Sequence, residues 1–83
     1  MKAVYFAWVR ERVGKAEEVI DPPASVATVA DLIGWLSVRG ENYAHAFERV
    51  SVIRAAIDRA HVKHDAPLAG AREIAFFPPM TGG

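Results

Sequence analysis

Cysteine does not occur among the 83 residues of the chain. Disulfide bridges, zinc–thiolate sites and a thiol nucleophile are therefore excluded. Uninterrupted apolar segments are short, and none approaches the roughly 18 residues that a membrane-spanning helix needs. Neither sign of charge is in excess, because 10 Lys and Arg residues balance 10 Asp and Glu residues without any block of like charge. We therefore expect neither a membrane nor a nucleic acid as partner, since phosphate-backbone binding needs clustered cations.

The composition is typical of one folded domain. Hydrophobic residues make up 52% of the chain and charged residues 24%, which is too apolar for a disordered segment. A chain of 83 residues holds a single hydrophobic core, because separate domains usually need about 100 residues or more each. Residues 1–4 lack the basic, apolar and small-residue features of a secretory signal, so we expect a cytoplasmic protein.

The N-terminal segment predicts a β-hairpin. Residues 2–8 are rich in aromatic and β-branched side chains, and Phe6 and Trp8 share one face of the predicted strand. Gly14 suits a turn, and residues 17–20 form a second, shorter extended stretch.

A helix is predicted to begin near Val29. Thr28 and Asp31 have the spacing of a capping box, in which each side chain accepts a hydrogen bond from the other residue's backbone. The buried stripe at helical spacing consists of Val29, Leu32, Ile33 and Leu36. Gly40 is predicted to end this helix as a left-handed cap. The next segment, residues 41–50, is either a short helix or an irregular turn.

The C-terminal half predicts three more strands. Residues 52–57 and 60–64 form a second hairpin, because Asp58 and Arg59 interrupt the alternation between them. Residues 72–77 form the last strand, which we expect to pair with the first at the centre of the sheet. The fold class is therefore α+β, with a mixed sheet of four to five strands covered on one face by one main helix. We assign residues 1–77 to the domain and residues 78–83 to a flexible tail.

The histidines do not predict a metal or catalytic site. His61 and His64 are three residues apart in an extended segment, so their side chains point to opposite faces. His45 lies in another segment, with no obvious carboxylate partner. No glycine-rich phosphate loop and no nucleophile elbow occur in the sequence. An independent active site is therefore not expected.

The C-terminal tail has the composition of a segment that enters another protein. Pro78 and Pro79 end the strand and hold the following chain extended, because each fixes φ and lacks an N–H. The residues beyond them are Met80, Thr81, Gly82 and Gly83. Four extended residues reach about 13 Å, and two glycines without a β-carbon fit a narrow channel. A frayed end or an expression scar is the alternative interpretation.

Two phrases of the sequence resemble a known family. They are FAWVRERVG, residues 6–14, and FFPPMTGG, residues 76–83. Both are similar to the small subunit of molybdopterin synthase, a family of ubiquitin-like sulfur carriers with the β-grasp fold. The resemblance runs over nearly the full length. Asp58 stands where the family commonly has Asn, and His61 where it often has an apolar residue.

The resemblance implies that Gly83 carries the reaction. A partner resembling the ubiquitin-activating enzymes would use ATP to adenylate its carboxylate, and a sulfur donor would displace AMP to leave a thiocarboxylate. The loaded tail would enter the large synthase subunit and supply sulfur to cyclic pyranopterin monophosphate. Gly82 would permit threading, and the channel would be lined by Pro78, Pro79, Met80 and Thr81. The small subunit would bind no cofactor and would form a heterotetramer of two small and two large subunits.

The partner surface is expected to contain Phe77, Arg10 and His61. Phe77 serves as the apolar anchor, with Arg10 beside it if the first and last strands pair. Two other functions stay open at this point. One is a sulfur carrier for thiamine or another thio-modification pathway, and the other is a ubiquitin-like interaction module whose tail never reacts.

Overall fold

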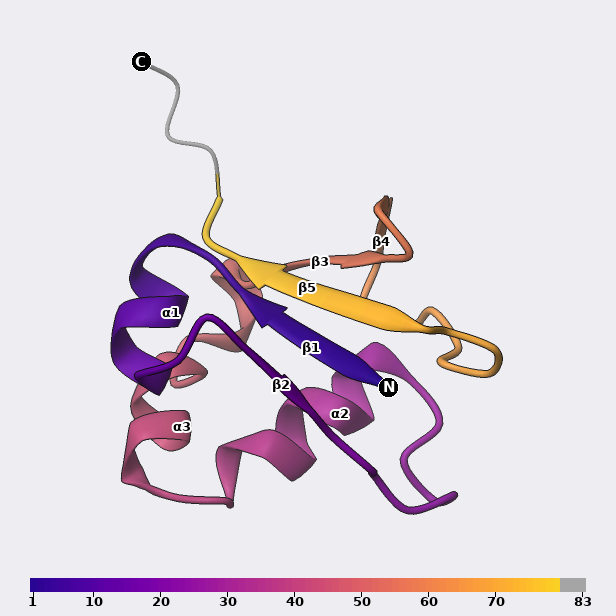
Figure 1. Cartoon of the computed structure of the whole chain (residues 1–83), viewed down its shortest axis with the longest axis horizontal. Helices are drawn as coiled ribbons and strands as arrows, with labels where there is room; N and C mark the ends of the chain where they lie inside the picture. The colour runs from indigo at the N-terminus through magenta and orange to yellow at the C-terminus, as the bar shows by residue number, and fades with distance from the viewer. Residues whose placement is uncertain (80–83) are drawn as a thin grey trace.

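Five short strands form one mixed sheet in the computed structural model, which describes residues 1–79 (Figure 1). Their order across the sheet is β2-β1-β5-β3-β4. In chain order the elements are β1 Lys2–Tyr5, α1 Ala7–Val13, β2 Glu17–Val19, α2 Val29–Ser37, α3 Glu41–Ala46, a 3-10 turn Val50–Val52, β3 Arg54–Ile57, β4 Ala60–Val62 and β5 Glu73–Phe77. The α+β class with a mixed sheet is confirmed.

Strand β5 occupies the centre of the sheet, as predicted. It runs parallel to β1, with Tyr5 opposite Phe76, and antiparallel to β3, with Arg54 opposite Phe77. Strands β2 and β4 form the two edges, each antiparallel to its neighbour. The last strand thus joins the two hairpin-like halves of the chain into one sheet.

The first predicted strand was too long. Strand β1 ends at Tyr5, and the residues from Ala7 to Val13 form helix α1. Val9 and Val13 lie one turn apart on this helix and are buried, so helical spacing prevails over the alternation that continued from β1. Gly14 has a φ of 90° and caps the helix by donating its N–H to the Arg10 carbonyl at 2.8 Å.

Helix α2 begins as predicted but ends earlier. The Asp31 N–H donates to Thr28 Oγ1 and the Thr28 N–H donates to Asp31 Oδ2, both at 3.2 Å, so the capping box is confirmed. The four residues of the predicted stripe are all buried. The helix ends at Ser37, and Gly40, with an extended φ of 168°, instead precedes α3. The left-handed cap predicted at Gly40 was therefore wrong.

Residues 41–50 contain a helix rather than an irregular turn. Helix α3 is followed by the 3-10 turn, so strand β3 begins at Arg54 instead of residue 52. The predicted second hairpin is confirmed. Asp58 and Arg59 both have positive φ, at 47° and 72°, which matches the right-handed twist of a two-residue hairpin.

The three helices cover one face of the sheet (Figure 1). Phe76 lies at the centre of this core, where its ring stacks on Tyr5 at 6.4 Å and meets the edge of Phe47 at 5.2 Å between centroids. Alternation along β5 buries Ile74 and Phe76 on the covered face and directs Phe77 to the opposite face. No helix of the described residues is long and apolar enough to cross a membrane.

Candidate functional site

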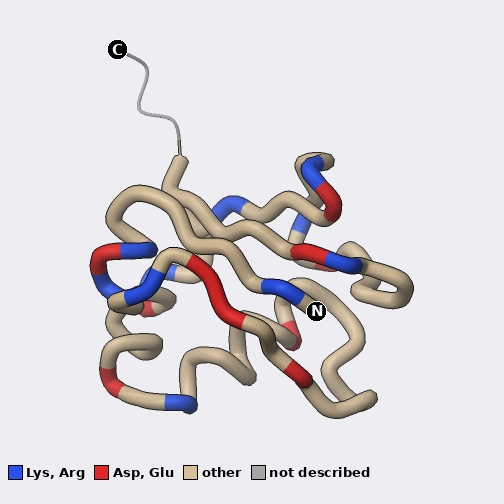
Figure 2. The backbone as a smooth tube through the Cα atoms, in the orientation of Figure 1, with Lys and Arg blue, Asp and Glu red and all other residues tan. Residues whose placement is uncertain are grey.

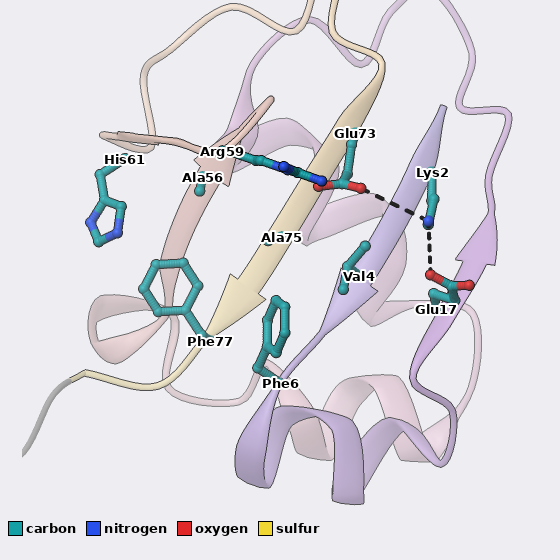
Figure 3. Close-up of a pocket in the computed structure, with 10 residues that line it drawn as sticks. All are labelled: Lys2, Val4, Phe6, Glu17, Ala56, Arg59, His61, Glu73, Ala75 and Phe77. Carbon is teal, nitrogen blue, oxygen red and sulfur yellow. Dashed lines mark ion pairs between the residues drawn. The ribbon is translucent and has the colours of Figure 1, made fainter.

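The uncovered face of the sheet holds a shallow hollow beside the start of the tail (Figure 3). All five strands contribute to it, together with the β3–β4 turn and the residue that follows β1. The residues lining it are Lys2, Val4, Phe6, Glu17, Ala56, Arg59, His61, Glu73, Ala75 and Phe77. Side chains of the same type lie together within it, so it has an apolar half and a charged half.

The apolar half lies nearest to the tail. Phe77, the last residue of β5, and Phe6, the residue after β1, lie side by side in Figure 3. Phe6 is 47% exposed, an unusual exposure for a phenylalanine in a small domain. The small side chains of Ala56 and Ala75 form the floor between the strands. A pair of aromatic rings, one exposed and one partly exposed, over a small-residue floor is the type of surface that anchors a partner protein.

The backbone at the end of β1 places Phe6 on this face. Phe6 is extended, with φ of −125° and ψ of 155°, and its N–H donates to the Phe76 carbonyl at 3.1 Å. Ala7 then has a φ of 52°, in the left-handed region. This conformation costs a non-glycine residue about 1–2 kcal/mol and turns the chain from the sheet into helix α1. Sequence reasoning did not assign Phe6 to the partner surface, although its alternation with Val4 indicated the face.

The structure brings two of the three predicted surface residues together. The rings of His61 and Phe77 lie 5.1 Å apart between centroids, with an angle of 54° between their planes. Arg10 lies on helix α1, one turn after Phe6, and does not line the hollow. The first and last strands do pair, but β1 ends at Tyr5, so Arg10 is not a strand residue, and its place beside Phe77 stays a prediction. The binding roles of all three residues stay predictions.

The charged half lies away from the tail. Lys2 Nζ lies 2.9 Å from Glu17 Oε2 and 4.0 Å from Glu73 Oε1. The hydrogen bond and the charge of Glu17 raise the pKa of Lys2 above its ordinary value, with a smaller contribution from Glu73. Arg59, from the β3–β4 turn, borders Glu73 in Figure 3.

Glu18 joins the sheet edge to the helices on the covered side. Its Oε2 accepts hydrogen bonds from the hydroxyls of Tyr5 and Tyr43, each at 2.7 Å, and its Oε1 lies 3.2 Å from Arg39 Nη1 and 3.6 Å from Lys15 Nζ. Burial raises the pKa of Glu18, but the two tyrosine hydrogen bonds and the charge of Arg39 outweigh it, so the pKa lies below its ordinary value. Burial and Glu18 raise the pKa of Tyr5.

This network around Glu18 holds β2 in place and takes no part in the hollow. Figure 2 shows Glu17 and Glu18 as the long acidic stretch along β2.

The histidines do not converge. His64 Nε2 lies 2.7 Å from the Ile53 carbonyl, whereas His61 faces the hollow. His45 does have a carboxylate nearby, since its Nε2 lies 3.9 Å from Glu48 Oε1, so that expectation was wrong. Residues 1–79 contain no group of three or more potential ligands that could hold a metal ion.

The tail leaves the sheet directly after Phe77. Strand β5 ends there as predicted, and Pro78 and Pro79 follow, both partly buried. The roles assigned to Met80, Thr81, Gly82 and Gly83 lie outside the described residues. The division into a domain of residues 1–77 and a tail of residues 78–83 also stays a prediction.

Comparisons with known proteins decide the family. The sequence model of the ThiS family matches residues 3–83. The chain belongs to the ThiS family. Two curated relatives are each described as "Molybdopterin synthase sulfur carrier subunit". The protein of Escherichia coli (strain K12) is 36% identical and that of Haemophilus influenzae is 30% identical, each over 100% of this chain and 99% of the relative. The resemblance stated from the sequence is confirmed.

Solved structures support the fold of this ThiS-family chain. SAMP1 from Haloferax volcanii superposes with a TM-score of 0.72 at 24% identity, covering 100% of this chain and 98% of SAMP1. The putative molybdopterin converting factor, subunit 1, from Pyrococcus furiosus superposes with a TM-score of 0.74 at 28% identity, covering 95% of each chain. The ubiquitin-like β-grasp fold is confirmed.

Proposed function

We propose that this ThiS-family chain is the sulfur carrier subunit of a molybdopterin synthase. The observation that carries the proposal is the end-to-end similarity to two proteins of that description, the closer of the two at 36% identity. The family match extends through Gly83, the residue to which the proposed chemistry is assigned. The small subunit is not an enzyme on its own but supplies the sulfur for a reaction completed in the complex.

The chemistry begins at the Gly83 carboxylate. A carboxylate is a poor electrophile, so an adenylyltransferase of the ubiquitin-activating type forms the acyl adenylate from ATP and releases pyrophosphate. A sulfur donor then attacks the carbonyl carbon, AMP leaves with one carboxylate oxygen, and one sulfur takes the place of that oxygen. Because the chain has no cysteine, no thiol within it can capture the activated terminus. ATP is consumed by the partner, and the carrier itself binds no cofactor.

Delivery of sulfur requires docking on the large synthase subunit. The apolar half of the hollow, around Phe77 and Phe6 with His61 at its side, anchors the large subunit. Pro78 and Pro79 lower the entropic cost of ordering the tail, because they restrict its free state. The remaining tail residues enter a channel, where Gly82 allows close passage, and the thiocarboxylate transfers sulfur to cyclic pyranopterin monophosphate. Two small and two large subunits form the complex. The cytoplasmic location of the chain stays a prediction.

The test is reconstitution of the reaction. The chain is incubated with the adenylyltransferase, ATP and a sulfur donor, and is then mixed with the large subunit and the pterin precursor. We expect formation of the dithiolene product, and we expect none when Gly82 and Gly83 are deleted. A loaded chain that supports no pterin conversion would instead indicate a carrier for thiamine or another thio-modification pathway. A chain that cannot be loaded would indicate a non-reacting ubiquitin-like module.

A further inference from the structure

Four charged side chains form a row across the half of the hollow that lies away from the tail (Figure 3). From β2 to the β3–β4 turn they are Glu17, Lys2, Glu73 and Arg59, and we call them the charge row. Their signs alternate. Lys2 bridges its two acidic neighbours at 2.9 and 4.0 Å, and the row as a whole has no net charge.

The charge row contributes little to the stability of the fold. The side chains of Glu17, Lys2 and Glu73 are 56%, 46% and 29% exposed. Ion pairs at such exposure stabilise a protein by about 0–1 kcal/mol each, because water competes and long side chains lose freedom. The same exposure leaves the charged groups accessible to another protein. The alternating signs of the charge row are therefore better explained by contact with another protein than by the stability of the domain.

The hollow is asymmetric with respect to the tail. Phe6 and Phe77 lie at the end where the tail leaves, and the charge row lies at the opposite end. A partner rotated in the plane of the sheet would set apolar groups over charges and charges over the aromatic rings. Desolvating a charge without a partner, or placing like charges together, is costly. The face thus disfavours docking orientations in which its apolar and charged ends are exchanged.

We propose that the charge row sets the orientation in which the large subunit docks, and so directs the tail toward its channel. This inference rests on the proposed function. The matching surface of the partner has an apolar patch over Phe6 and Phe77, with cations over Glu17 and Glu73 and anions over Lys2 and Arg59. Because the row is neutral, the partner recognises the order of the charges and not their sum.

The test inverts the row while keeping its internal attractions. The variant E17K/K2E/E73K/R59E has the same net charge as the wild type and the same alternation, with every sign reversed. The matched control R12E/E48R inverts an ion pair on the helical side, where Arg12 Nη1 lies 3.5 Å from Glu48 Oε1. Thermal unfolding of each variant is measured first. Association rate and Kd for the wild-type large subunit are then measured by surface plasmon resonance.

We expect the inverted row to raise the Kd about tenfold or more, chiefly through slower association, at an unchanged unfolding midpoint. The control should bind within about twofold of the wild type, since its ion pair lies away from the hollow. If the variant with the inverted row bound the large subunit with the wild-type Kd, the charge row would not be the orienting feature. An equal increase in the Kd of the control variant would lead to the same conclusion. Absence of binding by the wild-type chain would overturn the proposed function itself.

The double variant K2E/E17K guards against failure of the fourfold variant to fold. It reverses the closest pair, at 2.9 Å, and keeps the attraction between the two side chains. It also sets like charges at positions 2 and 73, where the wild-type groups lie 4.0 Å apart, but both side chains are partly exposed, so the variant should unfold close to the wild-type midpoint. It should associate several-fold more slowly. Association at the wild-type rate would contradict the inference.

Discussion

Phe76 and Phe77 are neighbours in β5 with identical side chains, yet they lie on opposite faces of the sheet. Phe76 is 0% exposed and packs against Tyr5 and Phe47 under the helices. Phe77 is partly exposed and contacts His61 on the uncovered face. The covered face is closed by the helices within the described chain, whereas the other face presents an aromatic patch to solvent. One face therefore stabilises the fold, and the other is available to a partner.

Truncation of each phenylalanine should separate the two faces most clearly. Phe76→Ala removes a fully buried ring and should lower the free energy of unfolding by about 3–5 kcal/mol. Phe77→Ala should lower it by about 1 kcal/mol or less, since the ring is partly exposed. Chemical denaturation gives both values. In the reconstituted reaction, Phe77→Ala should nevertheless lose most of the sulfur transfer, because it removes the proposed anchor.

Phe77→Leu serves as the control for the uncovered face. It keeps an apolar side chain and should retain most of the transfer activity. Equal destabilisation by Phe76→Ala and Phe77→Ala would break the distinction between the faces. Full transfer activity in Phe77→Ala would remove the uncovered face from the docking surface.

A substitution in the network around Glu18 measures how much this network stabilises the edge of the covered side. Glu18→Gln removes the charge that Arg39 and Lys15 neutralise and weakens the hydrogen bonds from the two tyrosines. We expect a loss of about 1.5–3 kcal/mol in the free energy of unfolding, the range for hydrogen bonds to a charged group. Docking should be unchanged, because Glu18 does not line the hollow.

The same network predicts a pH dependence. The pKa of Glu18 is lower in the folded protein than its ordinary value, so the folded state favours the carboxylate. The stabilisation is therefore present above the ordinary glutamate pKa of about 4.3 and is lost as pH falls through the lower folded pKa. Denaturation curves of the wild type and Glu18→Gln should converge over that acidic range. A constant difference between them at all pH values would contradict the assignment.

Ala7 marks the point where the chain passes from the uncovered face to the covered one. Its left-handed φ of 52° favours glycine, so Ala7→Gly should leave stability unchanged or raise it by up to about 1 kcal/mol. Ala7→Val should lower stability by about 1–2 kcal/mol, because a β-branched residue resists this conformation. Thermal unfolding of the pair measures the difference. The reverse order of stabilities would show that the turn after Phe6 relaxes to another geometry.

The smallest effect on stability is expected at the end of the tail. Removing Gly83, or adding one residue after it, should change the free energy of unfolding by less than about 0.5 kcal/mol, the range of substitutions that touch no structural feature of a domain. Sulfur delivery in the reconstituted reaction should be abolished by either change. A large loss of stability would indicate that the tail packs against the domain.

Much of the fold could be predicted from the sequence, because several local signals agree. Helix α2 was predicted from the capping box of Thr28 and Asp31 and from the buried stripe after it. The two faces of β5 were predicted from the alternation of its side chains. Helix α1 was missed because the alternation predicted for residues 2–8 extends over the first two residues of the helix, Ala7 and Trp8. It thereby hides the helical spacing of Val9 and Val13. Gly40 was misassigned because glycine is most enriched just after a helix but also occurs at the N-cap, which is the position that Gly40 takes before α3.

The candidate site was predicted only where it follows from strand order. Pairing of the last strand with the first, and alternation along the last, placed Phe77 on a surface, and the second hairpin brought His61 to it. Phe6 was missed because its exposure depends on the left-handed turn at Ala7, and alanine carries no signal for that conformation. The charge row was not predictable, because its members come from three strands and one turn. How close these elements lie in space depends on the complete sheet.

The most direct test of the proposed carrier is the intact mass of the chain after incubation with the adenylyltransferase, ATP and a sulfur donor. A gain equal to the exchange of one oxygen for one sulfur, localised to Gly83 by fragmentation, is the predicted result. An unchanged mass at Gly83, under conditions in which an established carrier of the family is loaded, would contradict it.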